Sequence, residues 1–212
     1  MSRLKLGVLV SGNGSNLQAI LDAIGSGLLQ AELRLVVSDN PKAYALERAQ
    51  KAGIPFAIIE KKNFENKTLF EKALISFLKK AEVDWVVLAG FMKILSADFL
   101  NEFPSRIVNI HPSLLPTFPG LNAIEQAWNY GVKVTGCTVH LVDEGCDTGP
   151  ILGQTPVLVE AEDNLESLTK KIHAAEHELY PRVLQNLVIK NSESCRGGAS
   201  VPARTQPYFE PK

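Results

Sequence analysis

Two polar residues with complementary chemistry, Asn109 and His111, are separated by one residue near the end of a short apolar run. Alternate residues of a β-strand point to the same side, so both side chains would face the same space. Histidine can move a proton near neutral pH, and a neutral amide donor beside it could stabilise an oxyanion. The pair therefore fits acyl-type chemistry. The alternative is structural: His111 bonds to the following loop and Asn109 caps it.

A glycine-rich turn, SGNGSN at residues 11–16, lies between an apolar run and a helical pattern. Helix N-termini offer free N–H groups, and glycine lets a phosphate approach the backbone, so the turn predicts a phosphate site. It is not a dinucleotide fingerprint, because the third glycine would fall at Leu17, and no P-loop lysine follows. Asp39 leaves a dinucleotide-type site open as an alternative. A plain tight turn with Ser15 as the helix cap is the structural alternative.

The turn DEGCDTGP, residues 143–150, contains three acidic residues. Their spacing fits neither an EF-hand nor a histidine-based metal motif, so we expect no metal there. One of these carboxylates, if held beside His111, would favour the charged imidazole ring and fix its tautomer. The three cysteines, Cys137, Cys146 and Cys195, are odd in number and lack CxxC spacing, which argues against disulfides and zinc.

A third polar cluster lies on a predicted helix, where His173, Glu176 and His177 share one face. The motif HAAEH resembles the inverted zinc-protease motif, but the rest of the chain offers no second metal-type cluster. A polar contact to substrate is therefore expected in place of zinc. His140, within the alternating segment TVHLV, is interpreted as a half-exposed strand residue.

The elements that must position these residues alternate between strand and helix. Nearly continuous apolar runs predict strands buried on both faces, as in a parallel sheet flanked by helices. The predicted strands cover residues 4–10, 33–37, 56–59, 85–89 and 107–110, and helical patterns follow the first three of them. This order specifies an α/β fold with a Rossmann-like, mainly parallel twisted sheet flanked by helices. Ligands then belong at the carboxyl ends of the strands.

The C-terminal half has a different pattern, with two strands predicted over residues 134–142 and 151–159 as an antiparallel extension. A final helix is expected from about Asn164, a plausible N-cap, to Val188. We expect a single domain over residues 1–190 and a partly ordered C-terminal tail over residues 191–212.

The composition restricts the class of protein. The 212 residues carry 22 Lys and Arg against 23 Asp and Glu, so the net charge of -1 provides no basic field for nucleic acid. No apolar run approaches the roughly 20 residues of a membrane span, and the first apolar stretch is too short for a signal peptide. We expect a cytoplasmic protein that binds neither nucleic acid nor membrane, and either a monomer or a homodimer.

Five ordered motifs, with comparable spacing, carry a resemblance to a known family. They are VLVSGNGSNLQAI, VVLAGFMKILS, NIHPSLLPTFPG, DTGPIL and EHELYP. Together they closely resemble the folate-dependent formyltransferase family, in the branch that acts on glycinamide ribonucleotide in purine biosynthesis, over about residues 4–189. HPSLLP alone is shared with other formyltetrahydrofolate enzymes, so the full set of motifs makes the resemblance specific.

The resemblance implies transfer of a formyl group from 10-formyltetrahydrofolate, as co-substrate, to the amine of glycinamide ribonucleotide. The transfer would be direct, through a tetrahedral intermediate, with no metal. Implied catalytic residues are Asn109, His111 and Asp147. Implied ribonucleotide contacts are Gly14, Ser15, Asn16, His173, Ala174, Ala175 and Glu176. Implied folate contacts are Lys67, Met92, Lys93, Ile94, Leu95, Asn109, Asp143, Glu144, Gly145, Cys146 and Asp147.

Two residues depart from the family pattern. Lys67 stands where some members have arginine, and His173 stands where some have glutamine. The first change could weaken a folate contact, because lysine lacks the planar two-donor fork of arginine.

Three other functions stay open as alternatives. Methionyl-tRNA formyltransferase and formyltetrahydrofolate hydrolase share the HPS loop, but each normally carries an added domain. The first strand begins at Leu4 and about 23 residues follow the last predicted helix, so neither addition is expected. A non-catalytic nucleotide-binding module is disfavoured because Asn109, His111 and Asp147 are all present.

Overall fold

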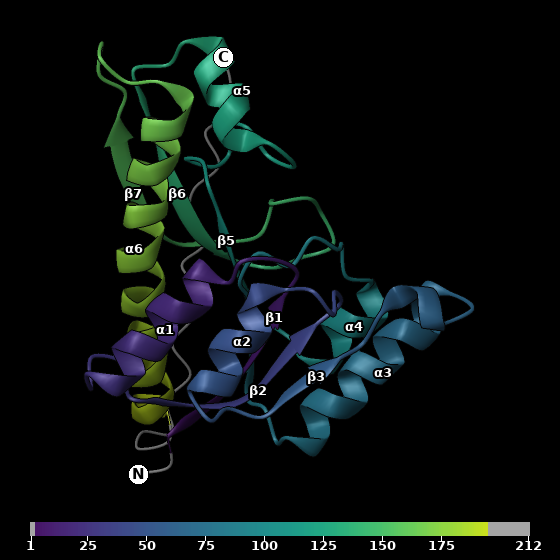
Figure 1. The fold of residues 1–212 in the computed structure, drawn as a ribbon. Coiled ribbons are helices and arrows are strands. Elements are labelled where there is room, and N and C mark those ends of the chain that lie inside the picture. The colour runs from purple at the N-terminus through teal and green to yellow at the C-terminus, as the bar shows by residue number, and fades with distance from the viewer. Residues whose placement is uncertain (1–2, 195–212) are drawn as a thin grey trace, which may run out of the picture.

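The computed structural model describes residues 3–194, which form one seven-stranded sheet with helices on both faces (Figure 1). The strand order is β3-β2-β1-β4-β5-β6-β7. Strands β1 to β5 run parallel, and β6 and β7 are antiparallel to their neighbours. The predicted Rossmann-like fold with an antiparallel extension is therefore confirmed.

The element bounds agree closely with the predicted strands. The strands are β1 (Leu4–Val10), β2 (Ala31–Ser38), β3 (Phe56–Ile58), β4 (Trp85–Leu88), β5 (Ile107–His111), β6 (Val134–Leu141) and β7 (Ile151–Leu158). The helices are α1 (Ser15–Gly25), α2 (Tyr44–Lys51), the 3₁₀ turn η1 (Lys61–Asn63), α3 (Lys67–Lys80), α4 (Ala97–Glu102), α5 (Ala123–Tyr130) and α6 (Leu165–Ser194). Helices α4 and α5 were not predicted.

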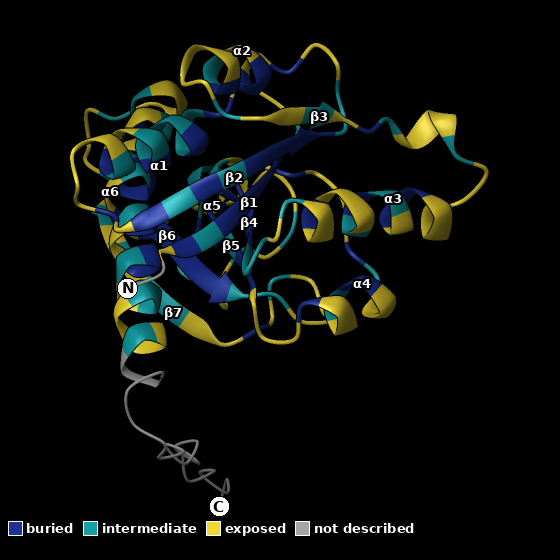
Figure 2. Ribbon diagram, turned by 90° about the horizontal axis from the view of Figure 1, so that it is seen from below, coloured by how far each residue is buried: buried dark blue, intermediate teal, exposed yellow. Residues whose placement is uncertain are grey.

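Two hydrophobic cores lie on opposite faces of the sheet (Figure 2). Helices α1, α2 and α6 supply side chains such as Leu17, Leu46 and Tyr180 to one core. Helices α3 and α4 supply side chains such as Phe70 and Phe99 to the other. The central strands are consequently buried on both faces, which is why their sequences are apolar without alternation.

Helix α6 extends to Ser194, beyond the predicted end at Val188. Its start is as predicted, since the Asn164 side chain accepts a hydrogen bond from the backbone N–H of Ser167 at 2.9 Å. Most of the predicted tail, residues 195–212, lies outside the described residues, and the division into residues 1–190 and 191–212 stays a prediction. In residues 3–194, no helix combines the length and apolar character needed to cross a membrane.

A fully buried tyrosine of α6 fixes this helix to the centre of the sheet. The hydroxyl of Tyr180 lies 2.9 Å from the carbonyl oxygen of Leu88, the last residue of β4, and 3.1 Å from that of Val108 in β5. Glu176 lies one helical turn before Tyr180 on α6, so the docking of this helix also places Glu176 beside the N-terminus of α1.

Candidate active site

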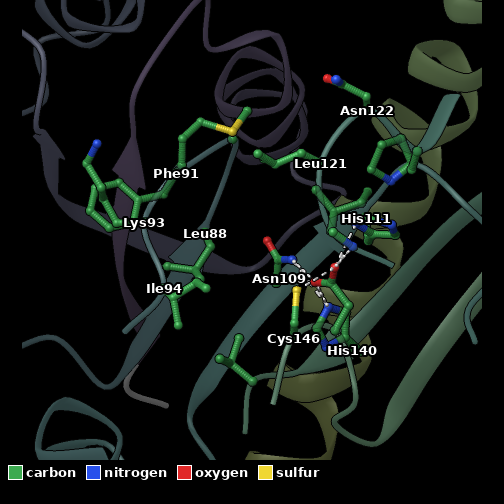
Figure 3. Close-up of a pocket in the computed structure, with 18 of the residues that line it drawn as sticks. Leu88, Phe91, Lys93, Ile94, Asn109, His111, Leu121, Asn122, His140 and Cys146 are labelled. Atoms are coloured by element: carbon green, nitrogen blue, oxygen red, sulfur yellow. Dashed lines mark hydrogen bonds and ion pairs between the residues drawn. The ribbon is translucent and has the colours of Figure 1, made fainter. Parts of the chain in front are cut away.

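A cavity of about 570 Å³ opens at the carboxyl ends of the parallel strands, where the fold predicts a ligand site. Its walls come from the segment after β4, the end of β5, the start of α5 and the turn between β6 and β7 (Figure 3). Met92 and Ile94 on one side and Leu121 on the other present exposed apolar side chains. Polar side chains converge at the end formed by β5 (Figure 3).

At that end the structure brings Asn109, His111 and Asp147 together. Nδ1 of His111 lies 3.3 Å from Oδ2 of Asp147, and Nδ2 of Asn109 lies 3.5 Å from Oδ1 of the same carboxylate. Asp147 has a left-handed backbone, φ 57°, and accepts a hydrogen bond from the N–H of Gly120 at 2.8 Å. The contact between His111 and the acidic turn, which sequence separation concealed, is present.

His111 is buried, and both of its ring nitrogens face hydrogen-bond acceptors. Nε2 lies 2.8 Å from the carbonyl oxygen of Phe118, and Nδ1 faces the carboxylate of Asp147. A carbonyl oxygen can only accept, so Nε2 carries a hydrogen, and only the doubly protonated ring donates to both partners.

Asp147 is held as a carboxylate. Burial opposes the ionisation of Asp147. Hydrogen bonds from the His140 ring and the Gly120 N–H group act the other way, as does the charge that His111 can carry. Together these effects outweigh burial and lower the pKa of Asp147 to about 2. The site therefore keeps a fixed negative charge beside His111 throughout the neutral pH range.

His140 is a member of this cluster that the sequence analysis assigned wrongly. Its side chain is buried, not half-exposed, with Nε2 3.2 Å from Nδ2 of Asn109 and 3.5 Å from Oδ1 of Asp147. The reason is that β6 is an interior strand, and its register pairs His140 directly with Asn109. The register of β6 against β5 cannot be derived from local sequence patterns, so the contact between His140 and Asn109 could not be predicted.

The glycine-rich turn leads directly into α1, with Gly14 at the N-cap in a left-handed conformation, φ 74°. Gly14, not Ser15, is therefore the N-cap of α1. Asn16 donates from Nδ2 to Oε2 of Glu176 at 3.1 Å, across 160 residues of chain. Oδ1 of Asn16 is buried and has no hydrogen-bond partner within residues 3–194. An acceptor that is buried and unsatisfied in the free protein indicates a place for a ligand donor.

Arg48 of α2 supports this turn, and the sequence analysis missed it. Its guanidinium donates to the backbone carbonyl and the side-chain oxygen of Asn13, each at 3.0 Å, and to Gln18 at 3.0 Å. The turn therefore gains both rigidity and a neighbouring positive charge, two properties that suit an anion site.

The predicted cluster on α6 is only partly directed inward. Glu176 is buried, and burial raises its pKa to about 7 against the opposing effect of the hydrogen bond from Asn16. His173 and Ala174 are exposed and Ala175 is buried. Both His173 and His177 lose part of their hydration to neighbouring side chains, and this partial desolvation lowers the pKa of each ring. Within residues 3–194, no three His, Cys, Asp or Glu side chains are arranged to hold a metal ion.

The buried carboxyl of Glu176 makes a testable contribution to stability. Its folded pKa of about 7 exceeds the ordinary glutamate value of 4.5, so the folded state binds this proton more tightly, and stability falls as pH rises from about 4.5 to about 7. Glu176→Gln removes this dependence, so the fall in Tm between about pH 5 and about pH 8 becomes smaller than in wild type. Calorimetry at both pH values measures it. Glu178→Gln, on an exposed residue of α6, is the matched control, and equal falls in Glu176→Gln and wild type would contradict the assignment.

Most residues predicted for the folate side line the cavity. Those that do are Met92, Lys93, Ile94, Leu95, Asn109, Asp143, Gly145, Cys146 and Asp147. Two of the predicted residues, Glu144 and Lys67, lie outside this lining. Lys67 is instead on α3, with Nζ 3.7 Å from Oε1 of the buried Glu71.

The chain belongs to the formyl transferase family, whose model matches residues 4–184, and is therefore a one-carbon transferase. It is 44% identical to phosphoribosylglycinamide formyltransferase of Bacillus subtilis over 188 residues, which cover 89% of this chain and 96% of that protein. It is 48% identical to the trifunctional purine biosynthetic protein adenosine-3 of Drosophila melanogaster over 188 residues, but these span only 14% of that protein.

Solved structures with similar folds belong to the same group. Glycinamide ribonucleotide transformylase 1 from Symbiobacterium toebii matches with a TM-score of 0.87 and 45% identity, over 89% of each chain. Phosphoribosylglycinamide formyltransferase from Bacillus halodurans matches with a TM-score of 0.86 and 46% identity, over 88% of this chain and 96% of the other.

Proposed function

We propose that this protein transfers a formyl group from 10-formyltetrahydrofolate to the primary amine of glycinamide ribonucleotide, a step of purine biosynthesis. The family match and the names of the relatives support this function. The observation that carries it is the cluster of Asn109, His111 and Asp147 at the polar end of an apolar-walled cavity. A flat pteridine ring suits such walls, since small-molecule sites are mostly apolar with a few placed polar groups.

The reaction needs stabilisation of the oxyanion that forms when the amine attacks the formyl carbon. Nδ2 of Asn109 carries two hydrogens, so it can donate one to the cluster and one to this oxyanion. His111 can donate from Nε2 once the substrate oxygen replaces the carbonyl of Phe118 as its partner. Asp147 stabilises the imidazolium. The tetrahedral intermediate then collapses with cleavage of the bond between the formyl carbon and N10 of the folate, and the proton lost by the attacking amine passes to N10.

We assign the phosphate of the ribonucleotide to the backbone N–H groups of the turn at residues 11–16, with the side chains of Ser15 and Asn16. The helix N-terminus and the nearby charge of Arg48 support an anion there. Glu176 and the exposed face of His173 and Ala174 then border the rest of this substrate. The folate lies in the cavity, and the two substrates meet at Asn109.

Purified protein tests the function directly. With a 10-formyl-folate substrate, the absorbance change on folate release should depend on added glycinamide ribonucleotide. Release that needs no acceptor would indicate a hydrolase. Ribonucleotide binding without any release would indicate a non-catalytic binding module.

Gly14 provides a separate test of the phosphate assignment. A Cβ on Gly14 would lie 2.6 Å from Cβ of Ala45, on a residue whose φ of 74° disfavours side chains. Gly14→Val should therefore displace the turn and its N–H donors and weaken ribonucleotide binding about tenfold or more, since one hydrogen bond to a charged group contributes about 1.5–3 kcal/mol. Folate binding should stay nearly intact. Calorimetry with each ligand separately measures this.

The matched control is Gly12→Ala in the same turn, where an added Cβ meets no protein atom within 4 Å. Loss of ribonucleotide affinity in this variant would come from crowding of the ligand alone. Equal loss of both affinities in Gly14→Val would show a misfolded domain and would remove the support for the phosphate site.

A further inference from the structure

One wall of the cavity is a segment without regular secondary structure, residues 90–96, which we call the wall segment. It has no strand ladder along its length, so other contacts must fix it. At its start, Met92 donates its N–H to Oγ of Ser11 at 3.0 Å, and Gly90 accepts from the N–H of Ser11 at 3.1 Å. In its middle, Nζ of Lys93 lies 3.3 Å from the buried carboxylate of Asp39.

The end of the wall segment is fixed by Glu71 of α3. This side chain is only 3% exposed, and Oε1 accepts from the backbone N–H of Ser96 at 2.9 Å while Oε2 accepts from the hydroxyl of Ser96. Ser96 Oγ also accepts from the N–H of Phe99 and so caps α4. One buried carboxylate therefore joins α3, the wall segment and the start of α4.

A buried carboxylate is expensive unless hydrogen bonds and opposite charge compensate it. The neighbouring inward positions of α3, Phe70 and Leu74, are apolar, as packing against the sheet requires. Glu71 touches no reacting group in the proposed mechanism. Two of its contacts are to Ser96, at the end of the wall segment, and the third is to Lys67, whose Nζ lies 3.7 Å away.

We infer that Glu71 is the positioning residue of the folate subsite, holding the wall segment where the folate substrate meets it. The inference rests on the proposed function. A wall that is already ordered binds its ligand without the entropic cost of fixing it. Loss of Glu71 therefore weakens folate binding and leaves the chemistry at Asn109 and His111 in place.

Glu71→Gln tests this, because glutamine keeps the size and one acceptor oxygen but loses the charge and the second acceptor. We expect KM for the 10-formyl-folate substrate to rise about fivefold to tenfold, with kcat at saturation and KM for the ribonucleotide changed less than about twofold. Calorimetry with 5,8-dideazafolate, which carries no formyl group, should show the same loss of affinity. A purely structural role would lower Tm without this split between the two substrates.

Two further variants keep the test decisive. Glu65→Gln makes the same charge change on an exposed residue just ahead of α3 and should leave both KM values unchanged. Ser96→Ala removes the hydroxyl bond to Glu71 but keeps the backbone N–H bond, so it should give a smaller rise in the folate KM. Combining it with Glu71→Gln should add little, since Glu71→Gln already weakens the bond that Ser96→Ala removes. If Glu71→Gln fails to fold, Ser96→Ala alone must show the selective rise.

Equal effects on both substrates, or an unchanged affinity for 5,8-dideazafolate, would overturn the role of Glu71. Failure of the proposed function gives a different result: wild type then shows no acceptor-dependent release. If wild type still binds 5,8-dideazafolate in that case, the calorimetric comparison continues to test Glu71. If wild type does not bind it, both proposals are wrong.

Discussion

Replacing His111 by alanine lowers kcat of formyl transfer by about 10²–10⁴-fold and changes KM for either substrate by less than about threefold. The ring lies beside the carboxylate of Asp147, and its Nε2–H is directed at a carbonyl that the substrate oxygen can replace. Its donation strengthens as charge develops on that oxygen, so its loss acts on the transition state more than on binding. Asn109→Ala should lose about 10²–10³-fold in kcat for the same reason.

Steady-state kinetics with each substrate varied in turn measures both variants. Asn101→Ala, on the exposed surface of α4, makes the same chemical change as Asn109→Ala away from the cavity and should behave as wild type. A near-normal kcat in His111→Ala or Asn109→Ala would remove that residue from the mechanism.

Asp147→Asn has the second large expected effect. Asparagine keeps the shape but removes the charge that stabilises the His111 imidazolium, so kcat should fall by about 10²–10³-fold while both substrates still bind. Because the pKa of Asp147 is about 2, it is ionised throughout the neutral range, and its own titration does not shape the pH–rate profile there. Kinetics from about pH 5 to about pH 9 tests this.

The same residue has a predictable effect on stability. Its folded pKa of about 2 lies below the ordinary aspartate value of 3.8, so ionisation stabilises the native state above about pH 4, and this gain disappears as pH falls towards about 2. The difference in unfolding free energy between wild type and Asp147→Asn should therefore be larger at about pH 7 than at about pH 2.5 in urea titrations. Asp98→Asn, on an exposed residue, is the control. In the kinetic experiment described above, intact activity in Asp147→Asn would show that the turn at residues 143–150 has only a structural role.

The sheet could be predicted from the sequence because its strands are buried on both faces. A run such as residues 4–10 is apolar for that reason, and one sequence is enough to show it. The short helices could not be predicted in the same way. Helix α4 has six residues, of which only Phe99 is buried, so it has no periodicity to detect. Helix α5 has eight residues and is capped by Asn122 and Gly131, both in left-handed conformations that could not be predicted from the sequence.

The site was predictable to the extent that it is local. Asn109 and His111 lie on one strand, so the strand geometry alone placed them together. Asp147 came from the resemblance to a family, because its contact with Asn109 spans 38 residues. The role of His140 depends on a register that no local pattern encodes, and the contacts of Arg48 depend on packing between helices.

The hydroxyl of Tyr180 bears on the order in which the site assembles during folding. Its contacts with Leu88 and Val108 span 92 and 72 residues, and the contact from Asn16 to Glu176 spans 160. Contacts of such separation form after local ones, because the loop must close before they stabilise anything. Domains fold as their chains emerge from the ribosome, so strands β1 to β5 can pair before α6 has been synthesised. The proposed ribonucleotide site is then completed only when α6 docks, so a partly synthesised chain should not retain that ligand.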